Sequence, residues 1–192
     1  MLYRVCRRVL RVLYAVFYRF EASGLENIPA TGGVILCSNH LSVLDPPTVG
    51  TKLNRRVHYM AKAELFQIPL FGPFIRKLGA FPVKRGGVSK DAIRSSITLL
   101  QGGGVMGIFP EGTRKAAASE MGKKGAAMIA MRSKATIIPV AIVGNYRIFR
   151  KMKIRFGKPI DISAFTEDPA SDVLEQVTEA IMKRIREMVA QG

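Results

Sequence analysis

The stretch VILCSNHLSVLDPP, residues 34–47, decides how the rest of the chain is interpreted. Its first residues, Val34 to Leu36, form the kind of apolar run that indicates a buried strand. The two prolines at 46–47 indicate that the chain turns and begins a short helix soon afterwards. His40 and Asp45 therefore lie beyond the end of a strand, on a loop or a first helical turn, where catalytic groups are common.

The spacing of His40 and Asp45 suits general acid–base chemistry. A carboxylate beside an imidazole can fix its tautomer and stabilise its protonated form, which leaves the other ring nitrogen free as a general base. The alternative is a helix-capping aspartate beside a structural histidine. His58 is the other histidine of the chain, and it has no carboxylate nearby in sequence before Glu64, so we interpret it as structural.

Composition indicates a folded chain with anionic partners. The chain has 192 residues, of which 48% are hydrophobic, enough for one domain with a core. Its 30 basic and 14 acidic residues give a net charge of +16, which favours nucleic acid, a phosphorylated substrate or an anionic lipid surface. Cys6 and Cys37 suggest no disulfide framework and, with two scattered histidines, no zinc site. Reduced thiols favour the cytoplasm.

Residues 1–20 have the pattern of an amphipathic helix. Arginines at positions 4, 8, 11 and 19 recur at helical spacing, and apolar residues fill much of the rest. Four arginines among the first eleven residues argue against a membrane span, because each costs about 2.5–3.5 kcal/mol at the bilayer centre. We expect an interfacial helix with its arginines on lipid phosphates. The alternative is a helix that packs its apolar stripe on the core of this protein.

Strand and helix patterns alternate over the remaining chain. Turn residues fill 24–33, and the dense apolar stretch 65–75 is either core, an acyl-chain wall or a membrane-facing patch. The alternation predicts an α/β sandwich with a largely parallel central sheet flanked by helices, in one domain over residues 23–192, after an N-terminal helix within 1–22. Further strands are expected at 57–60, 80–83, 105–109, 136–143 and 152–156, and further helices at 89–101, at 125–133 and from Pro169 onward.

Four blocks carry a resemblance to a known family. They are the Asn-His-x-x-x-x-Asp segment from Asn39, the block GAFPVKR at 79–85, FPEGTR at 109–114, and IPVAI at 138–142. In this order and spacing they resemble the glycerolipid acyltransferase family, with the bacterial 1-acyl-glycerol-3-phosphate acyltransferases most similar. The resemblance spans about Gly24 to Pro159 and implies transfer of a fatty acyl group from a thioester to the sn-2 hydroxyl of 1-acyl-glycerol 3-phosphate, giving phosphatidic acid.

The resemblance also implies residue roles. His40 would be the base and Asp45 its orienting partner. Lys62, together with a backbone N–H near Gly112, would stabilise the oxyanion. The acyl donor would bind near Pro139. The family uses no metal and no cofactor besides its co-substrate, acyl-coenzyme A or acyl carrier protein.

The second and third blocks suit an acceptor phosphate, which the resemblance also implies. Arg85 and Arg114 each offer a planar guanidinium matched to phosphate oxygens. Gly112 permits close approach of the backbone, and Thr113 adds a hydroxyl. Glu111 would orient an arginine or accept from a glycerol hydroxyl. Without the flanking motifs, the two arginines would be interpreted as solvated surface charges.

The sequence favours direct transfer. No serine or cysteine stands in a Gly-x-Ser-x-Gly elbow. Ser38 and Ser42 lie close to His40, so an acyl-enzyme route remains as an alternative. Cys37 is expected to be buried.

We expect peripheral or monotopic attachment at the cytoplasmic face of the cell membrane, with an anionic lipid surface and a lysophospholipid as partners and no nucleic acid. Rival functions are acylation of glycerol 3-phosphate or another lysolipid, nucleic-acid binding, and a non-enzymatic membrane module. Nucleic-acid binding would explain the charge, but no helix-turn-helix or aromatic-studded basic sheet is apparent. A membrane module would leave three polar blocks unexplained.

Overall fold

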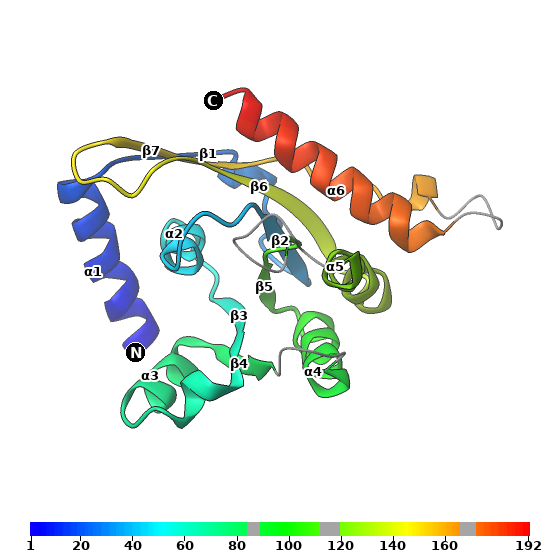
Figure 1. Ribbon diagram of the computed structural model, residues 1–192, viewed down its shortest axis with the longest axis horizontal. Helices are drawn as coiled ribbons and strands as arrows, with labels where there is room; N and C mark the ends of the chain where they lie inside the picture. The colour runs from blue at the N-terminus through cyan, green and yellow to red at the C-terminus, as the bar shows by residue number, and fades with distance from the viewer. Residues whose placement is uncertain (84–88, 112–119, 166–171) are drawn as a thin grey trace.

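The described part of the chain is organised around a seven-stranded sheet with the strand order β1-β7-β6-β2-β5-β3-β4 (Figure 1). This computed structural model describes residues 1–83, 89–111, 120–165 and 172–192. Neighbouring strands are parallel except β6 and β7, which are antiparallel. The strands are β1 (Arg19–Ser23), β2 (Val34–Ser38), β3 (Val57–Lys62), β4 (Ala80–Val83), β5 (Val105–Ile108), β6 (Thr136–Gly144) and β7 (Lys151–Phe156).

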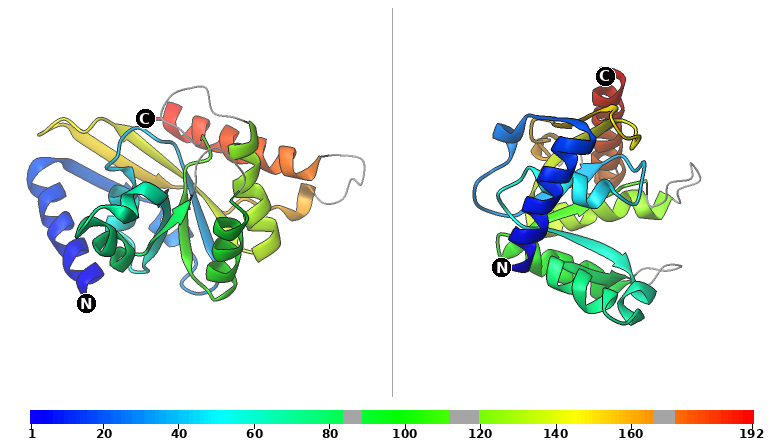
Figure 2. Two further views of the ribbon diagram at one scale, coloured as in Figure 1. Left: turned by 60° about the horizontal axis from the view of Figure 1, so that its bottom comes forward. Right: turned by 90° about the vertical axis from the view of Figure 1, so that its left-hand side faces the viewer.

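Helices cover both faces of this sheet (Figure 2). They are α1 (Leu2–Phe17), α2 (Asp45–Thr51), α3 (Phe71–Leu78), α4 (Lys90–Gln101), α5 (Glu120–Ser133) and α6 (Val173–Ala190). Short 3-10 turns are η1 (Leu25–Asn27), η2 (Ala63–Gln67) and η3 (Ser163–Phe165). The predicted α/β architecture with a mostly parallel sheet is confirmed.

The strand β2 lies in the middle of the sheet because it is apolar on both faces. Side chains alternate along a strand, so Ile35 and Cys37 point to one face and Val34 and Leu36 to the other. All four are at most 1% exposed, as expected of a parallel strand covered by helices on both sides. The core on the Ile35 face of the strand contains residues of α4, α5 and α6. The core on the Val34 face contains Val49 of α2.

The N-terminal helix is shorter than predicted. The structure ends α1 at Phe17, and residues 19–23 form β1, which pairs in parallel with β7. The prediction of a helix reaching residue 20 is therefore wrong at its end, because its last residues satisfy their backbone groups in the sheet.

Two arginines on the side of α1 that contacts the protein bind backbone carbonyl oxygens at the end of α2. Arg11 donates from Nε to the carbonyl oxygen of Thr51 (2.7 Å) and from Nη2 to that of Lys52 (3.2 Å), and Arg7 donates to the carbonyl oxygen of Leu53. These carbonyls lie at the C-terminal end of α2, where backbone acceptors have no intrahelical donors. The expectation that the arginines lie on lipid phosphates is thus wrong for Arg7 and Arg11, which hold α1 against α2.

Most other predicted elements are confirmed. The hydroxyl of Ser89 caps α4 by accepting from the backbone N–H of Ala92 (3.4 Å), as its position predicts. The helix expected from Pro169 begins at Val173 after an Asp172 cap, and Pro169 itself lies outside the described residues. Within the described ranges, no helix is long and apolar enough to cross a membrane.

Candidate active site

His40 and Asp45 are in direct contact. The Nδ1 atom of His40 lies 2.7 Å from Oδ2 of Asp45, which also accepts from the backbone N–H groups of Leu41 (2.6 Å) and Ser42 (2.7 Å). Asp45 is the first residue of α2 and is fully buried, whereas the side chain of His40 is 16% exposed. The loop between β2 and α2 thus folds around the carboxylate and leaves the imidazole accessible.

The surroundings of Asp45 keep it ionised. Burial by itself would raise its pKa, but hydrogen bonds from His40, from the backbone of Ser42, from Tyr146 and from the backbone of Leu41 outweigh burial and lower the pKa below its ordinary value. An ionised carboxylate only accepts, so Nδ1 of His40 carries a proton. The lone pair of the neutral ring therefore lies on Nε2, where a general base needs it.

An aromatic stack holds the ring of His40. It stacks on Phe109 with ring centroids 4.3 Å apart and an interplanar angle of 22°, and Phe109 stacks on Tyr59 at 6.1 Å. The ring of Tyr59 lies against Gly107, where an added Cβ would come within 2.1 Å of it. Glycine at this position in β5 thus leaves the space that the ring of Tyr59 needs to stack on Phe109.

Asn39 fixes the start of the loop that carries His40. Its Nδ2 donates to the carbonyl oxygen of Ile142 (2.9 Å), and its Oδ1 accepts from the backbone N–H of Ile142 (2.8 Å). The last backbone pair between β2 and β6 is Ser38 with Val140, so the side-chain amide of Asn39 continues the hydrogen bonding between the two strands beyond that pair. The residue before His40 is therefore tied to the sheet.

The remaining predicted site residues fall into three groups. Lys62 and Glu111 lie at the same edge of the sheet as His40: Lys62 is exposed at the end of β3, and Glu111 is half-buried in the turn after β5. Arg85, Gly112, Thr113 and Arg114 lie outside the described residues. Pro139 is buried inside β6, beside Cys37 of β2, so its link to the acyl donor stays a prediction.

The alternative nucleophiles gain no support from their surroundings. Cys37 is 1% exposed, and burial raises the pKa of its thiol to about 12. The hydroxyl of Ser38 is buried and finds no partner among the described residues. The Oγ of Ser42 accepts from the backbone N–H of Leu44 (3.2 Å). None of these contacts activates a nucleophile through His40.

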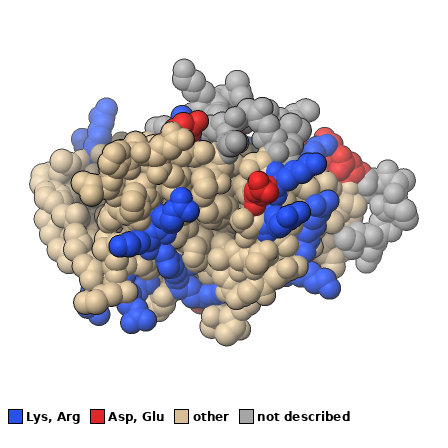
Figure 3. Space-filling model, turned by 90° about the horizontal axis from the view of Figure 1, so that it is seen from below, with Lys and Arg blue, Asp and Glu red and all other residues tan. Residues whose placement is uncertain are grey.

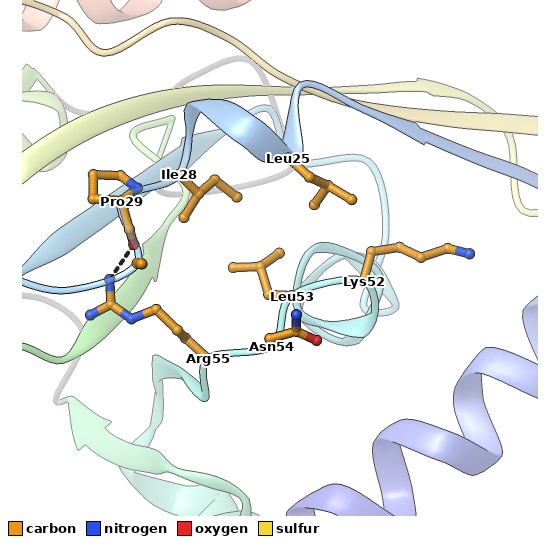
Figure 4. Close-up of a pocket in the computed structure, with 8 residues that line it drawn as sticks. Leu25, Ile28, Pro29, Lys52, Leu53, Asn54 and Arg55 are labelled. Carbon is orange, nitrogen blue, oxygen red and sulfur yellow. Dashed lines mark hydrogen bonds between the residues drawn. The ribbon is translucent and has the colours of Figure 1, made fainter.

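A surface cavity of about 300 Å³ lies elsewhere. It is lined by residues of the η1 region and of the segment that follows α2, among them Leu25, Ile28 and Leu53 (Figure 4). Arg55 at its border donates to the carbonyl oxygen of Pro29 (2.7 Å). The cavity is at the C-terminal end of α2 and Asp45 is at the N-terminal end, so this cavity is not part of the His40 site.

Sequence reasoning missed three contributors to the site: Asn39 as a backbone clamp, Phe109 as the ring beneath His40, and Tyr146 as a donor to Asp45. Asn39 and Phe109 belong to quoted blocks and could have been noted as candidates. Tyr146 is 101 residues from Asp45 in sequence, and no local pattern joins them.

Comparison with known proteins agrees with this geometry. A family model described as Acyltransferase matches residues 19–143. The 1-acyl-sn-glycerol-3-phosphate acyltransferase of Bacillus subtilis (strain 168) is 35% identical over 97% of this chain and 96% of its own length. A Streptococcus pneumoniae protein of the same name is 36% identical over 67% of this chain and 50% of its own.

A solved structure, that of the 1-acyl-sn-glycerophosphate (LPA) acyltransferase PlsC from Thermotoga maritima, matches with a TM-score of 0.78 and 26% identity, covering 98% of this chain and 78% of that one. The catalytic-type His–Asp pair, the mostly parallel sheet and these matches lead to one conclusion: the chain belongs to the acyltransferase family.

Proposed function

We propose that this enzyme transfers a fatty acyl group from a thioester to the sn-2 hydroxyl of 1-acyl-sn-glycerol 3-phosphate and so makes phosphatidic acid. The observation that carries the chemistry is the His40–Asp45 contact, which engages Nδ1 and leaves the lone pair on Nε2, in a side chain that is 16% exposed. The acceptor is supported by the names of the relatives from Bacillus subtilis and Streptococcus pneumoniae.

In the proposed reaction, Nε2 of His40 takes the proton of the glycerol hydroxyl as its oxygen attacks the thioester carbonyl. The tetrahedral intermediate collapses with loss of the thiolate, which receives the proton and leaves as a thiol. Lys62 and the backbone N–H near Gly112 would stabilise the oxyanion. The acceptor phosphate would bind Arg85 and Arg114, with Thr113 and Gly112 close to it and Glu111 orienting an arginine. The acyl donor, acyl-coenzyme A or acyl carrier protein, would bind near Pro139.

Purified full-length protein tests this proposal with three acceptors: 1-acyl-glycerol 3-phosphate, glycerol 3-phosphate and lysophosphatidylcholine. Each is offered acyl-coenzyme A and, separately, acyl carrier protein, and the products are separated and quantified. We expect phosphatidic acid from the first acceptor at a rate at least about tenfold above the others, because glycerol 3-phosphate lacks the acyl chain and lysophosphatidylcholine lacks the free phosphate monoester that the proposed arginines would bind. Faster acylation of glycerol 3-phosphate would contradict the proposed acceptor.

We also propose that the enzyme works as a peripheral protein on an anionic membrane at the cytoplasmic face. The apolar stripe of α1 faces away from the protein, and Tyr14 is the residue of this helix that is buried. The exposed members of the stripe are Leu2, Val5, Val9, Val12, Leu13, Val16 and Phe17. An apolar stripe turned outward, while Arg7 and Arg11 contact the protein, is the reverse of an ordinary core helix and suits an acyl boundary, with Arg4 and Arg8 exposed beside it.

Neighbouring segments extend this apolar surface. The helix α3 contacts α1, and this region exposes Ile68, Leu70, Phe71 and Phe74. At the other end of α1, the loop between β6 and β7 exposes Ile148 and Phe149, and the backbone N–H of Phe149 donates to the carbonyl oxygen of Phe17 (2.7 Å). Lys and Arg side chains are widespread and acidic ones few on the face shown in Figure 3, which favours anionic lipid.

Replacing Val5, Val9 and Val16 together by serine is expected to weaken binding to anionic liposomes by about ten- to a thousandfold, because each lost apolar group forfeits transfer energy into the acyl boundary. Co-sedimentation with phosphatidylglycerol-containing vesicles measures this. The matched control places leucine at the same three positions, which keeps the stripe and should bind at least as well as the wild type. Equal binding by the serine and leucine variants would contradict the membrane assignment. Point variants are preferable to deletion of α1, because deletion also removes the arginines that contact α2.

A further inference from the structure

The two carboxylate oxygens of Asp45 are held from different parts of the fold. The three donors to Oδ2, which are Nδ1 of His40 and the N–H groups of Leu41 and Ser42, come from the loop just before Asp45. The donor that the structure gives to Oδ1 is the hydroxyl of Tyr146, at 2.5 Å, on the loop between β6 and β7. The fully buried carboxylate is thereby bonded on both sides.

The direction of this bond is fixed by chemistry. An ionised carboxylate accepts only, so the hydroxyl of Tyr146 donates. Burial, and next the hydrogen bond to Asp45, raise the pKa of Tyr146 well above its ordinary value, so the hydroxyl keeps its proton. A phenol that donates to a carboxylate makes a short, charge-assisted bond.

Thr48 of α2 contacts the hydroxyl of Tyr146. Its Oγ1 donates to the carbonyl oxygen of Leu44 (2.8 Å) and lies 3.0 Å from the hydroxyl of Tyr146 and 2.7 Å from that of Tyr14 in α1. The ring of Tyr146 meets the edge of Tyr18 with centroids 6.4 Å apart. Tyr14 therefore belongs to the same cluster but contacts Thr48 and not Asp45, which makes it a natural control.

We propose that Tyr146 is a positioning residue for the His40–Asp45 pair, an inference that rests on the proposed role of His40 as base. The terminal torsion of an aspartate is broad, so a carboxylate bonded on one oxygen can turn. The bond from Tyr146 to Oδ1 stops this rotation and keeps Oδ2 facing Nδ1 of His40. Without it, a buried carboxylate oxygen would lose the donor that the described residues provide.

The same bond influences the pH at which the pair becomes active. The titratable groups near Asp45 in the described chain are His40 on its own loop, Tyr14 on α1, Tyr59 on β3 and Tyr146, and all three tyrosines are neutral at acid and neutral pH. The hydrogen bond from Tyr146 is one of the interactions that lower the pKa of Asp45. Removing it raises the pKa of Asp45, so the carboxylate is neutralised at a higher pH and the acid limb of the pH–rate profile moves to higher pH.

The test compares Tyr146→Phe with Tyr14→Phe, two variants that each lose one hydroxyl from the same cluster. Tyr146→Phe is expected to lower kcat about ten- to a hundredfold, to change KM for either substrate by less than about twofold, and to move the acid limb of kcat upward. Tyr14→Phe should keep kcat within about twofold and leave the acid limb in place. Wild-type kcat and an unmoved acid limb in Tyr146→Phe, or equal losses in both variants, would overturn the proposal.

Two further measurements separate positioning from general stability. In an Asp45→Asn background, Tyr146→Phe should have almost no further effect, because the carboxylate it positions is gone, whereas an additive loss would overturn the proposal. If Tyr146→Phe does not fold, Thr48→Val and Thr48→Ser replace it: a loss of kcat in the valine but not the serine variant supports the proposal, and equal kcat in both opposes it. If the proposed role of His40 as the base is wrong, His40→Ala would stay active, and this outcome separates that failure from a failure of the Tyr146 proposal.

Discussion

Replacing His40 by alanine is expected to lower kcat by about a hundred- to ten-thousandfold, the usual contribution of a general base. The reason is geometric: Asp45 holds Nδ1, Phe109 holds the ring, and the lone pair of Nε2 would accept the hydroxyl proton in the proposed reaction. KM for acceptor and donor should change little, because the imidazole acts mainly in the transition state. Initial rates with 1-acyl-glycerol 3-phosphate, together with the thermal unfolding midpoint, measure the effect.

The other histidine provides the control for this variant. His58 lies on β3, where its Nδ1 is 3.2 Å from the carbonyl oxygen of Val105, and burial lowers its pKa. His58→Gln should therefore keep kcat within a few-fold, with any change confined to stability. Added imidazole should restore part of the activity of His40→Ala, because the space beside Phe109 then admits a free base. A His40→Ala enzyme that folds and runs near the wild-type rate would refute the role of His40.

Replacing Asp45 by asparagine is expected to produce the second large loss, also about a hundred- to ten-thousandfold in kcat. The amide removes the negative charge that stabilises the protonated imidazole during proton transfer. We expect the amide oxygen to take the place of Oδ2, because an NH₂ group there would face the N–H donors of Leu41 and Ser42, so the lost charge accounts for the effect. Steady-state kinetics across pH measure it.

A neutral replacement elsewhere controls for loss of charge. Asp91 lies in the first turn of α4, on a different element from the loop that carries His40, and Asp91→Asn should retain wild-type kcat. Circular dichroism should show that Asp45→Asn keeps its fold, because the amide oxygen can still accept from the N–H groups of Leu41 and Ser42. A rate within threefold of wild type in Asp45→Asn would remove the carboxylate from the mechanism.

The fold could be predicted largely because this sheet has strong local signals. An apolar run such as residues 34–36 is stable where both of its faces are buried, which is between two layers of helices. The start of α4 is likewise a local signal, because Ser89 caps this helix through its own side chain. The strand at 19–23 could not be predicted, because it alternates weakly and follows a helical pattern without interruption. Its partner β7 lies more than a hundred residues later, so only the folded sheet reveals the pairing.

The candidate site divides in the same way. His40 and Asp45 are five residues apart, so a short loop could be expected to join them, and it does. The contacts of Asn39 with Ile142 and of Asp45 with Tyr146 each join residues about a hundred positions apart, and such pairs depend on strand order. The orientation of α1 was also beyond the sequence, because an amphipathic pattern does not say which side meets the protein.

The strand order has a consequence for how this enzyme could diversify. The strands β2, β5, β3 and β4 are neighbours in that spatial order and all run in parallel, so their carboxyl ends lie along one rim of the sheet. A loop that grows or shrinks after one strand leaves the hydrogen-bonded register of the other three untouched. Descendants could therefore acquire new acceptor preferences one loop at a time while inheriting the His40–Asp45 pair unchanged.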